Sequence, residues 1–330
     1  MKIVALEKVD REKVIQFLLP YEKFSVTLMS EILHGAESVY VVLNHFGSIK
    51  GVFSWWKGSS IHHCLPDAYG KNKVELENAF VEFFKDENMK YLFSLIGEEA
   101  GNKLIKNVIE KNFSKTPTHK LEYFLLENNR YDSKVSVERM NTQLSISICK
   151  EEEIEEIFPL QLEYEKEEVL ISGKEINENG CYAKLESYIE AGAIYLGKIK
   201  NKCLCKATIT EKGKNYVMLG GVYTIPKYRN HGLAKALLYN ICQEFNKRNK
   251  KIALFVKKEN VPASLTEQNS QPVKPSPVQP KKKAPADMQS IMREAQPLRS
   301  WPEVVANLKQ YSKVIASSFE GTTAYESGDY

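Results

Sequence analysis

The chain of 330 residues is long enough for about two domains of ordinary size. Its 46 lysine and arginine residues against 42 aspartate and glutamate residues leave a formal net charge of +4. That weak excess gives no reason to expect nucleic acid or an anionic membrane as a partner. The composition, 43% hydrophobic and 27% charged, is typical of a globular protein and excludes a disordered or fibrous chain.

The cysteines and the N-terminal segment indicate the compartment. The 6 cysteines are scattered without a C-x-x-C pair, which argues against a disulfide framework and a zinc site and favours a reducing compartment. Several charges fall between Glu7 and Lys13, before an apolar run could reach the length of a signal peptide. No stretch approaches the ~18 uncharged apolar residues of a membrane-spanning helix. We therefore expect a cytoplasmic protein.

Residues 1–130 have the alternating pattern of an α/β domain. Runs of β-branched and aromatic residues predict strands, and apolar residues at helical spacing predict helices. The expected strands are 39–43, 49–56, 91–96 and 119–126, and the expected helices are 73–85 and 98–111.

Residues 135–260 repeat this texture as a second domain. The order is strand, helices, antiparallel meander, helix and buried strand, which is again an α/β order. The expected strands are 144–149, 193–199, 204–211, 216–224 and 252–256, and the expected helices are 151–170, 185–191 and 232–247.

A proline-rich segment follows the second domain. Eight of the 13 prolines lie between Pro262 and Pro302, among serine, glutamine and a lysine run, so we expect residues 261–298 to form a flexible linker. Residues 299–330 are then a tail, in which apolar residues at helical spacing predict one helix over 302–317.

The most informative stretch joins the strand 216–224 to the helix 232–247. Pro226 ends the strand, and Gly232 with the small Ala234 allows a ligand to approach the first turn of the helix closely. Unpaired N–H groups and the helix dipole make such a terminus an anion site. Arg229 lies just outside it and can add a charge-assisted contact.

The run from Arg229 to Ala234, R-x-x-G-x-A, resembles the signature of the GNAT superfamily of acyl-CoA-dependent N-acyltransferases. In that family this turn holds the pyrophosphate of acetyl-CoA, and an asparagine follows the next strand, as Asn260 does here. The resemblance covers 144–260. It implies an acetyl-CoA site formed by Val222, Tyr223, Thr224, Arg229, Asn230, His231, Gly232, Leu233, Ala234 and Asn260.

Residues 1–130 resemble a degenerate copy of the same fold. The resemblance therefore implies two GNAT-like mixed sheets flanked by helices, followed by the proline-rich linker and a short helical tail. In the first copy we expect the equivalent turn at 96–101, where Glu98 and Glu99 would repel a diphosphate. On that expectation the first copy binds no CoA.

For the chemistry, the resemblance implies direct attack of an amine on acetyl-CoA in a ternary complex, without a covalent enzyme intermediate. Backbone N–H groups of 222–224 would meet the thioester carbonyl, and one such donor contributes about 3–4 kcal/mol. The candidate bases are carboxylates of the acidic helix around Tyr164, with Glu167 and Glu168 assigned the catalytic role. The alternative interpretation of these glutamates is a solvated helix face.

The sequence departs from the family after Asn260. The family continues with a helix whose tyrosine protonates the CoA sulfur, and with two closing strands. Here no tyrosine occurs between Tyr239 and Tyr311, so that water or Tyr311 would have to supply the proton. The strand 252–256 would be an exposed apolar edge, which either the tail or the N-terminal half could cover.

Two functions stay open on these observations. The first is an N-acyltransferase that uses acetyl-CoA and an amine, and the second is a catalytically impaired acyl-CoA-binding or interaction protein. We expect no nucleic acid, membrane or metal as a partner, and a dimer is left open. The tail from Arg299 to Val305 resembles the region beyond the linker in bacterial DNA polymerase III tau subunits, which would indicate a fusion of unrelated segments. The alternative for this tail is an ordinary interaction helix.

Overall fold

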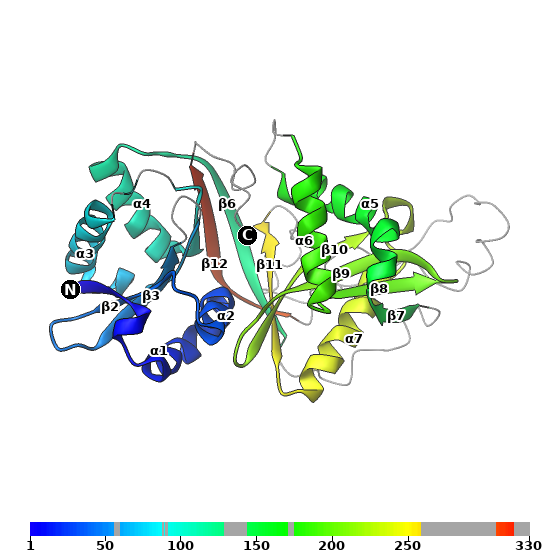
Figure 1. The fold of residues 1–330 in the computed structure, drawn as a ribbon, viewed down its shortest axis with the longest axis horizontal. Coiled ribbons are helices and arrows are strands. Elements are labelled where there is room, and N and C mark those ends of the chain that lie inside the picture. Colours follow the sequence, from blue (N-terminus) through cyan, green and yellow to red (C-terminus); the bar gives the residue numbers. More distant parts are fainter. Residues whose placement is uncertain are drawn as a thin grey trace, which may run out of the picture.

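The computed structural model describes residues 1–55, 60–87, 89, 92–128, 144–170, 175–258 and 308–319. Within them lies a 12-stranded sheet with the strand order β1-β2-β3-β4-β5-β12-β6-β11-β10-β9-β8-β7. The two expected mixed sheets are both present, and they are joined edge to edge (Figure 1).

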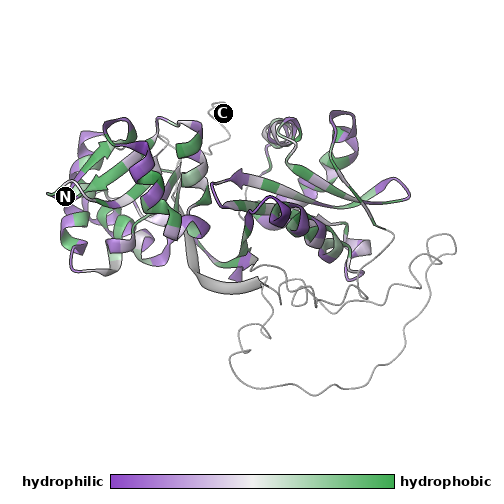
Figure 2. Ribbon diagram, turned by 90° about the horizontal axis from the view of Figure 1, so that it is seen from below, coloured by the Kyte–Doolittle hydropathy of each residue, from purple (hydrophilic) through white to green (hydrophobic). Residues whose placement is uncertain are grey.

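The N-terminal half packs helices on both faces of its strands. The strands are β1 (Lys2–Ala5), β2 (Val39–Leu43), β3 (Ile49–Trp55), β4 (Ser60–Cys64) and β5 (Ser94–Glu98). The helices are α1 (Arg11–Leu18), α2 (Val26–His34), α3 (Lys73–Asp86) and α4 (Glu99–Phe113). Leu18 and Met29 of α1 and α2 pack on one face, and Phe80 and Phe84 of α3 belong to the core on the other. In Figure 2 the strands of this half are mainly hydrophobic, and the helices alternate in hydropathy.

The C-terminal half is built in the same way. Its strands are β7 (Ser145–Ile148), β8 (Ile194–Ile199), β9 (Lys202–Lys212), β10 (Tyr216–Thr224) and β11 (Lys251–Lys257), and its helices are α5 (Ile154–Tyr164), α6 (Glu178–Glu190) and α7 (Leu233–Lys247). Ile157 and Leu185 of α5 and α6 pack on one face. Leu237 and Ile241 of α7 pack on the other, so the sheet lies between two helical layers.

The junction between the halves is formed by pairing of one strand from each half. Strand β6 (Pro117–Asn128) continues the N-terminal half and pairs antiparallel with β11 from Ala253 opposite Glu127 to Lys257 opposite Tyr123. This pairing covers the apolar edge of β11. Of the two covers expected from the sequence, the N-terminal half is therefore the one that the structure shows.

The helix expected over 302–317 is wrong where the structure describes this segment. Residues Leu308–Phe319 form the strand β12, which pairs antiparallel with both β5 and β6. A helix here would leave the facing edges of β5 and β6 unpaired, whereas a strand satisfies backbone groups on both. Local apolar spacing cannot reveal these distant partners. The linker 261–298 and the segment 299–305 lie outside the described residues.

A second expectation is wrong in the N-terminal half. The turn that corresponds to the one between β10 and α7 is not at 96–101. β10 pairs parallel with β11 and is connected to it through α7, while β4 pairs parallel with β5 and is connected to it through α3. The corresponding turn therefore runs from Cys64 to Lys73, and Glu98 and Glu99 belong to a different connection.

Buried carboxylates connect the halves. Glu22, in the 3-10 segment η2 (Leu19–Phe24), is 0% exposed and accepts the backbone N–H groups of Asn215 and Tyr216 at 2.7 and 3.1 Å. Glu127 of β6 accepts the Tyr216 hydroxyl at 2.6 Å and lies 3.3 Å from Lys251 Nζ. Burial alone would raise the pKa of Glu127, but these partners outweigh burial and lower it. In the described part of the chain, no helix is long and apolar enough to cross a membrane.

Candidate functional site

The parallel strands β10 and β11 lose their pairing part of the way along. They pair from Tyr216 opposite Lys251 to Leu219 opposite Leu254, and beyond Leu219 no residue of β10 pairs with β11. β10 nevertheless continues to Thr224. The end of β11 pairs only with β6 on its other side. Among the described residues, the last part of β10 thus has no neighbouring strand on its β11 side. This part lies at the carboxyl end of the parallel strands, where α/β folds commonly bind ligands.

A bulge begins where this pairing ends. The register with β9 slips between Gly220 opposite Thr208 and Tyr223 opposite Lys206. Gly221 lies in the slip with a φ of +55°, in the left-handed region. A Cβ atom on Gly221 would lie 2.8 Å from Thr208 Oγ1, so glycine is required both by backbone conformation and by space.

The bulge leaves backbone donors pointing to the unpaired side of β10. Ile225 N–H donates to Leu204 O at 3.0 Å on the β9 side. Because donors alternate along a strand, Tyr223 N–H faces β9, whereas the N–H groups of Val222 and Thr224 face the β11 side. These two donors belong to the segment 222–224 for which the sequence analysis expects contact with the acyl group.

The turn after β10 exposes the N-terminus of α7. Asn230 and Gly232 have φ values of +65° and +74°, and α7 begins at Leu233 without a side-chain cap. Ala236 N–H donates to Gly232 O at 3.0 Å, so the N–H groups of 233–235 have no acceptor in the helix. These donors, with the helix dipole behind them, suit an anion. Within the described residues, no protein group is seen to occupy them.

Arg229 and His231 are fixed by the same turn. The Arg229 guanidinium lies over the Tyr223 ring, with 5.3 Å between its central carbon and the ring centroid, and Nε donates to Thr224 O at 3.0 Å. His231 Nδ1 lies 2.7 Å from Arg229 O and 3.2 Å from Tyr228 O. Both neighbours of Nδ1 are carbonyl oxygens, which can only accept hydrogen bonds, so the proton is assigned to Nδ1.

The two candidate glutamates lie at the ends of both strands. α5 continues into a π-helical turn, η6 (Glu165–Val169), in which Leu170 N–H donates to Glu165 O at 2.8 Å. Glu167 pairs with Arg229 at 2.7 Å and lies 3.4 Å from the Tyr223 hydroxyl, at the end of β10. Glu168 lies 3.9 Å from Lys257, at the end of β11. The expected continuous helix over 151–170 is therefore interrupted where the candidate base residues lie.

A buried polar cluster beneath the bulge was missed by the sequence analysis. Lys206 of β9 is 0% exposed, and its Nζ donates to Gly221 O at 3.1 Å. Burial lowers the pKa of Lys206 to about 8, against the attraction of Glu165, which is itself buried. Gln161 Nε2 donates to Glu165 Oε1 at 2.8 Å. The signal in the sequence was a lysine in the middle of β9, between the apolar Leu204 and Cys205 on one side and Ala207 on the other.

Tyr164 completes this cluster from α5. Its hydroxyl oxygen accepts the N–H of Gly221, and burial raises the pKa of Tyr164 to about 12. Lys206 Nζ lies 4.9 Å from the centroid of the Tyr164 ring. Both backbone groups of Gly221 are therefore held by side chains.

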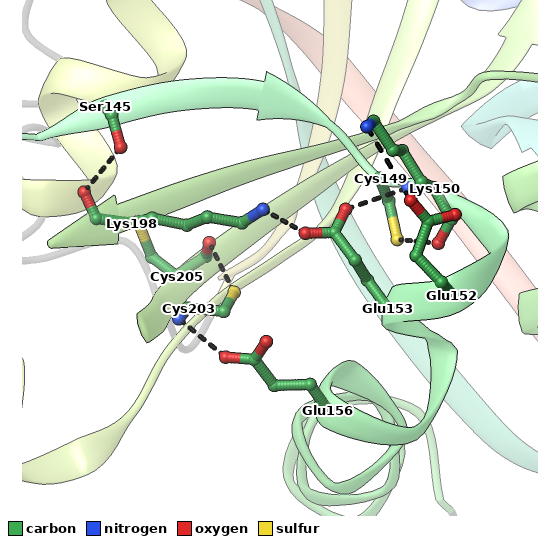
Figure 3. Close-up of polar contacts among 9 residues, drawn as sticks. All are labelled: Ser145, Cys149, Lys150, Glu152, Glu153, Glu156, Lys198, Cys203 and Cys205. Carbon is green, nitrogen blue, oxygen red and sulfur yellow. Dashed lines mark hydrogen bonds and ion pairs between the residues drawn. The ribbon is translucent and has the colours of Figure 1, made fainter. Parts of the chain in front are cut away.

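The other end of α5 is anchored to the strands as well (Figure 3). Glu153 accepts the N–H of Lys150 at 2.9 Å and also pairs with Lys198 of β8. Glu156 accepts the N–H of Cys203 at 2.9 Å, where β9 is bulged against β8. The position of Tyr164 relative to β9 and β10 is thus fixed by contacts at both ends of α5.

The expected site also includes Asn260 and Tyr223. Asn260 lies outside the described residues. The Tyr223 side chain is only 4% exposed and packs in the core under α5 and α6. No group of three or more metal-ligating side chains occurs in the described ranges.

A comparison with known protein families matches the part of the chain that holds this site. Residues 153–264 match the model of the acetyltransferase (GNAT) family. No curated protein matches the chain. This family match includes α5, the bulged β10, the uncapped terminus of α7 and β11.

Several solved structures match part or most of the chain. An acetyltransferase from the GNAT family of Colwellia psychrerythraea is 11% identical with a TM-score of 0.47, over 97% of this chain and 100% of that one. A tandem GNAT protein from the clavulanic acid biosynthesis pathway is 10% identical with a TM-score of 0.48, over 98% and 99% of the two chains. A predicted acetyltransferase from Clostridium acetobutylicum, solved with acetyl-CoA, is 15% identical with a TM-score of 0.30, over 42% of this chain and 96% of that one.

All three TM-scores are below 0.5, so the family assignment depends on the sequence match. That match coincides with the segment in which β10 parts from β11 and α7 exposes its first N–H groups. The segment 153–264 is therefore similar to the acetyltransferase (GNAT) family.

Proposed function

We propose that the chain is an N-acyltransferase that transfers an acetyl group from acetyl-CoA to an amine by direct attack in a ternary complex. The observation that carries the proposal is the juxtaposition of two sets of donors in the GNAT segment. One set is the uncapped N–H groups of 233–235 in α7, and the other is the N–H groups on the unpaired side of β10. They suit the two ends of an acyl-CoA, the pyrophosphate and the thioester.

The pyrophosphate is assigned to the turn 230–234. The two residues with positive φ, Asn230 and Gly232, turn the backbone so that α7 starts with its N–H groups uncovered. Arg229 lies beside this turn, but its guanidinium is engaged with Glu167. An arriving diphosphate therefore competes with Glu167 for Arg229.

The acyl end is assigned to the unpaired part of β10. The backbone N–H of Val222 or Thr224 would donate to the thioester carbonyl oxygen and stabilise the negative charge that develops there. A single donor of this kind contributes about 3–4 kcal/mol to the transition state. Because the donors are part of a strand held by β9, they need little reorganisation during the reaction.

The proton balance assigns roles to the remaining groups. An ammonium acceptor loses one proton to become a neutral amine, and its nitrogen then bonds to the carbonyl carbon. The carbon–sulfur bond breaks to give a thiolate, the nitrogen loses a second proton to give the amide, and the thiolate takes up a proton. Glu167 and Glu168 are the candidate bases, and each lies beside a cation, Glu167 beside Arg229 and Glu168 beside Lys257. We assign the proton on sulfur to water, since β6 separates β12, which carries Tyr311, from β11.

A second candidate function is acyl-CoA binding without transfer. It is favoured by the lack of any tyrosine between Tyr239 and Tyr311 and by the engagement of Glu167 with Arg229. In that case the anion site and the β10 donors would be retained, and the proton relay would be missing.

One experiment separates the two functions. Acetyl-CoA is titrated into the full chain by calorimetry, and release of free CoA thiol is then followed with a panel of primary amines. Binding together with amine-dependent thiol release supports the acyltransferase. Binding without release supports the binding protein, and absence of binding contradicts both.

A further inference from the structure

The bulge residue Gly221 is held at both of its backbone groups by side chains, one buried and one partly buried. Lys206 Nζ donates to its carbonyl oxygen at 3.1 Å, and the Tyr164 hydroxyl oxygen accepts its N–H. The two side chains come from β9 and α5, so a strand and a helix fix the same peptide. We call Lys206, Tyr164 and Gly221 the bulge clamp.

The clamp fixes the direction of a neighbouring donor. The carbonyl of Gly221 and the N–H of Val222 belong to one peptide unit, and no cis peptide bond is found in the described residues. In a planar trans peptide the C=O and N–H point in opposite directions. A carbonyl directed at Lys206 therefore directs the Val222 N–H away from Lys206 and β9.

The clamp is built from charges that are costly to bury. Lys206 is 0% exposed, and its countercharge is Glu165, which is 5% exposed and held by Gln161. Burying such a pair costs free energy unless both members are hydrogen-bonded. Apolar side chains of similar volume would fill the space at a lower cost in folding free energy. The free-energy cost of burying the Lys206 charge is explained if its ammonium group is needed at the Gly221 carbonyl.

We propose that Lys206 and Tyr164 are positioning residues that orient the Val222 N–H toward the carbonyl oxygen of a bound acetyl thioester. This inference rests on the proposed function, because it assumes that the thioester binds beside the unpaired part of β10. Neither side chain touches the substrate. Both act through the peptide between Gly221 and Val222.

The clamp also predicts a dependence on pH. The groups around Lys206 are Tyr164 from α5, Glu165 from η6, Cys181 and Lys184 from α6, and Cys203 from β9. Burial lowers the pKa of Lys206 to about 8, while burial raises the pKa of both cysteines to about 11 and 12, so that Lys206 changes charge first as the pH rises. An ammonium donates a stronger hydrogen bond than a neutral amine, so the orientation should weaken above about pH 8.

The test measures polarisation of the carbonyl directly. Acetyl-CoA labelled with ¹³C at the thioester carbonyl is bound to the full chain, and isotope-edited infrared difference spectra give the carbonyl stretching frequency. The proteins compared are the unaltered chain, Lys206→Met, Tyr164→Phe and the control Lys202→Met, which removes an exposed lysine of the same strand. Calorimetry with CoA measures binding of the nucleotide portion separately.

We expect binding to shift the carbonyl band of the unaltered chain and of Lys202→Met to lower frequency. Lys206→Met and Tyr164→Phe should lose at least half of that shift, with affinity for CoA within threefold of the unaltered chain. The shift should also shrink between pH 7 and pH 9 in the unaltered chain only. A residue with a merely structural role would change CoA affinity or stability without moving the band.

The outcomes separate this inference from the proposed function. If the unaltered chain binds acetyl-CoA and the band does not shift, or shifts equally in both clamp variants, the positioning role is overturned and the binding site stands. If the unaltered chain binds neither acetyl-CoA nor CoA, both are overturned. If Lys206→Met fails to fold by circular dichroism, Tyr164→Phe decides, because it removes a single oxygen atom.

Discussion

At the scale of single residues, the Arg229 guanidinium can pair with either of two anions, the Glu167 carboxylate or a bound pyrophosphate. It pairs with Glu167 at 2.7 Å, and both side chains are partly exposed. Exposed ion pairs of this kind contribute at most about 1 kcal/mol. A pyrophosphate at the start of α7 carries more charge than one carboxylate, so it can displace Glu167 and leave that carboxylate free near the end of β10.

This competition predicts that Glu167→Gln binds CoA more tightly than the unaltered chain. Removing the competing charge releases Arg229, and about 1 kcal/mol corresponds to roughly a fivefold gain in affinity as an upper limit. Calorimetry at low ionic strength measures the gain. The matched control is Glu163→Gln, because Glu163 pairs with Lys166 at 2.9 Å instead. Weaker binding by Glu167→Gln would contradict the competition.

A second prediction at this scale concerns stability. Because the pKa of Lys206 is lowered from 10.5 to about 8 on folding, the unfolded chain binds more protons between these values. The free energy of unfolding attributable to Lys206 should therefore rise with pH across that window. Relative to Lys206→Met, the unaltered chain should gain about 2 kcal/mol between pH 8 and pH 9.5 in urea unfolding. A stability difference that is constant with pH would show that Lys206 is not buried as a cation.

The residues that could be predicted from the sequence are those whose signal is local. Arg229, Gly232 and Ala234 lie within one short motif, and the structure places that motif at an uncapped helix start. Lys206 could not be assigned in this way. Its role depends on Gly221 across the sheet, and the bulge that brings them together appears only once β9 and β10 are paired.

At the scale of elements, the sheet is completed by strands from distant parts of the chain. β6 borders β11, and β12 lies between β5 and β6. The proposed acyl-CoA site and the junction thus share β11, which is unpaired with β10 at its end and paired with β6 along its other edge. The outer edge of β11 is therefore covered by another strand of the same chain.

The central position of β12 predicts a cost for a proline there. Val314 pairs with Glu98 of β5 and with Tyr123 of β6, so Val314→Pro removes a backbone donor in a strand with neighbours on both sides. We expect a loss of about 3 kcal/mol in the free energy of unfolding. Urea denaturation measures it, and Val314→Thr, which keeps the N–H, serves as the control. Equal stability of the two variants would argue against β12 as an internal strand.

Elements with strong local patterns were predicted well, and those that depend on distant pairing were not. The expected strand 216–224 coincides with β10, and the helix 232–247 differs from α7 by one residue at its start. No element was assigned before residue 39, although α1 and α2 lie there. Short helices of this kind gain most of their stability from tertiary packing, so their own sequence carries a weak signal.

At the scale of the whole molecule, the two halves share an order of elements but differ at the position of the site. In the N-terminal half, β4 pairs with β5 from Ser60 opposite Ser94 to His63 opposite Gly97, and β4 ends one residue later. His63 is 3% exposed and fills the space beside Gly97, where a Cβ atom would lie 2.3 Å from its ring. Among the residues of this half that the structure describes, no unpaired strand segment is comparable to the end of β10.

This difference predicts one acyl-CoA per chain. Calorimetric titration of the full chain with CoA should give a stoichiometry near one, because within the described ranges only the C-terminal half combines an unpaired strand end with an uncapped helix start. A stoichiometry near two would show that the N-terminal half binds CoA by other means. The buried contacts of Glu22 across the junction should keep the halves together during this titration.

The most direct test of the account is the affinity of Gly232→Glu for CoA. Gly232 has a φ of +74° at the start of α7, and a glutamate there adds backbone strain and a negative charge beside the proposed pyrophosphate. The matched control is Gly47→Glu, because Gly47 has a φ of +75° in a turn of the N-terminal half with open space around it. In calorimetry the account predicts at least a 100-fold loss of affinity, about 3 kcal/mol, for Gly232→Glu and none for Gly47→Glu. Unchanged affinity of a folded Gly232→Glu would contradict it.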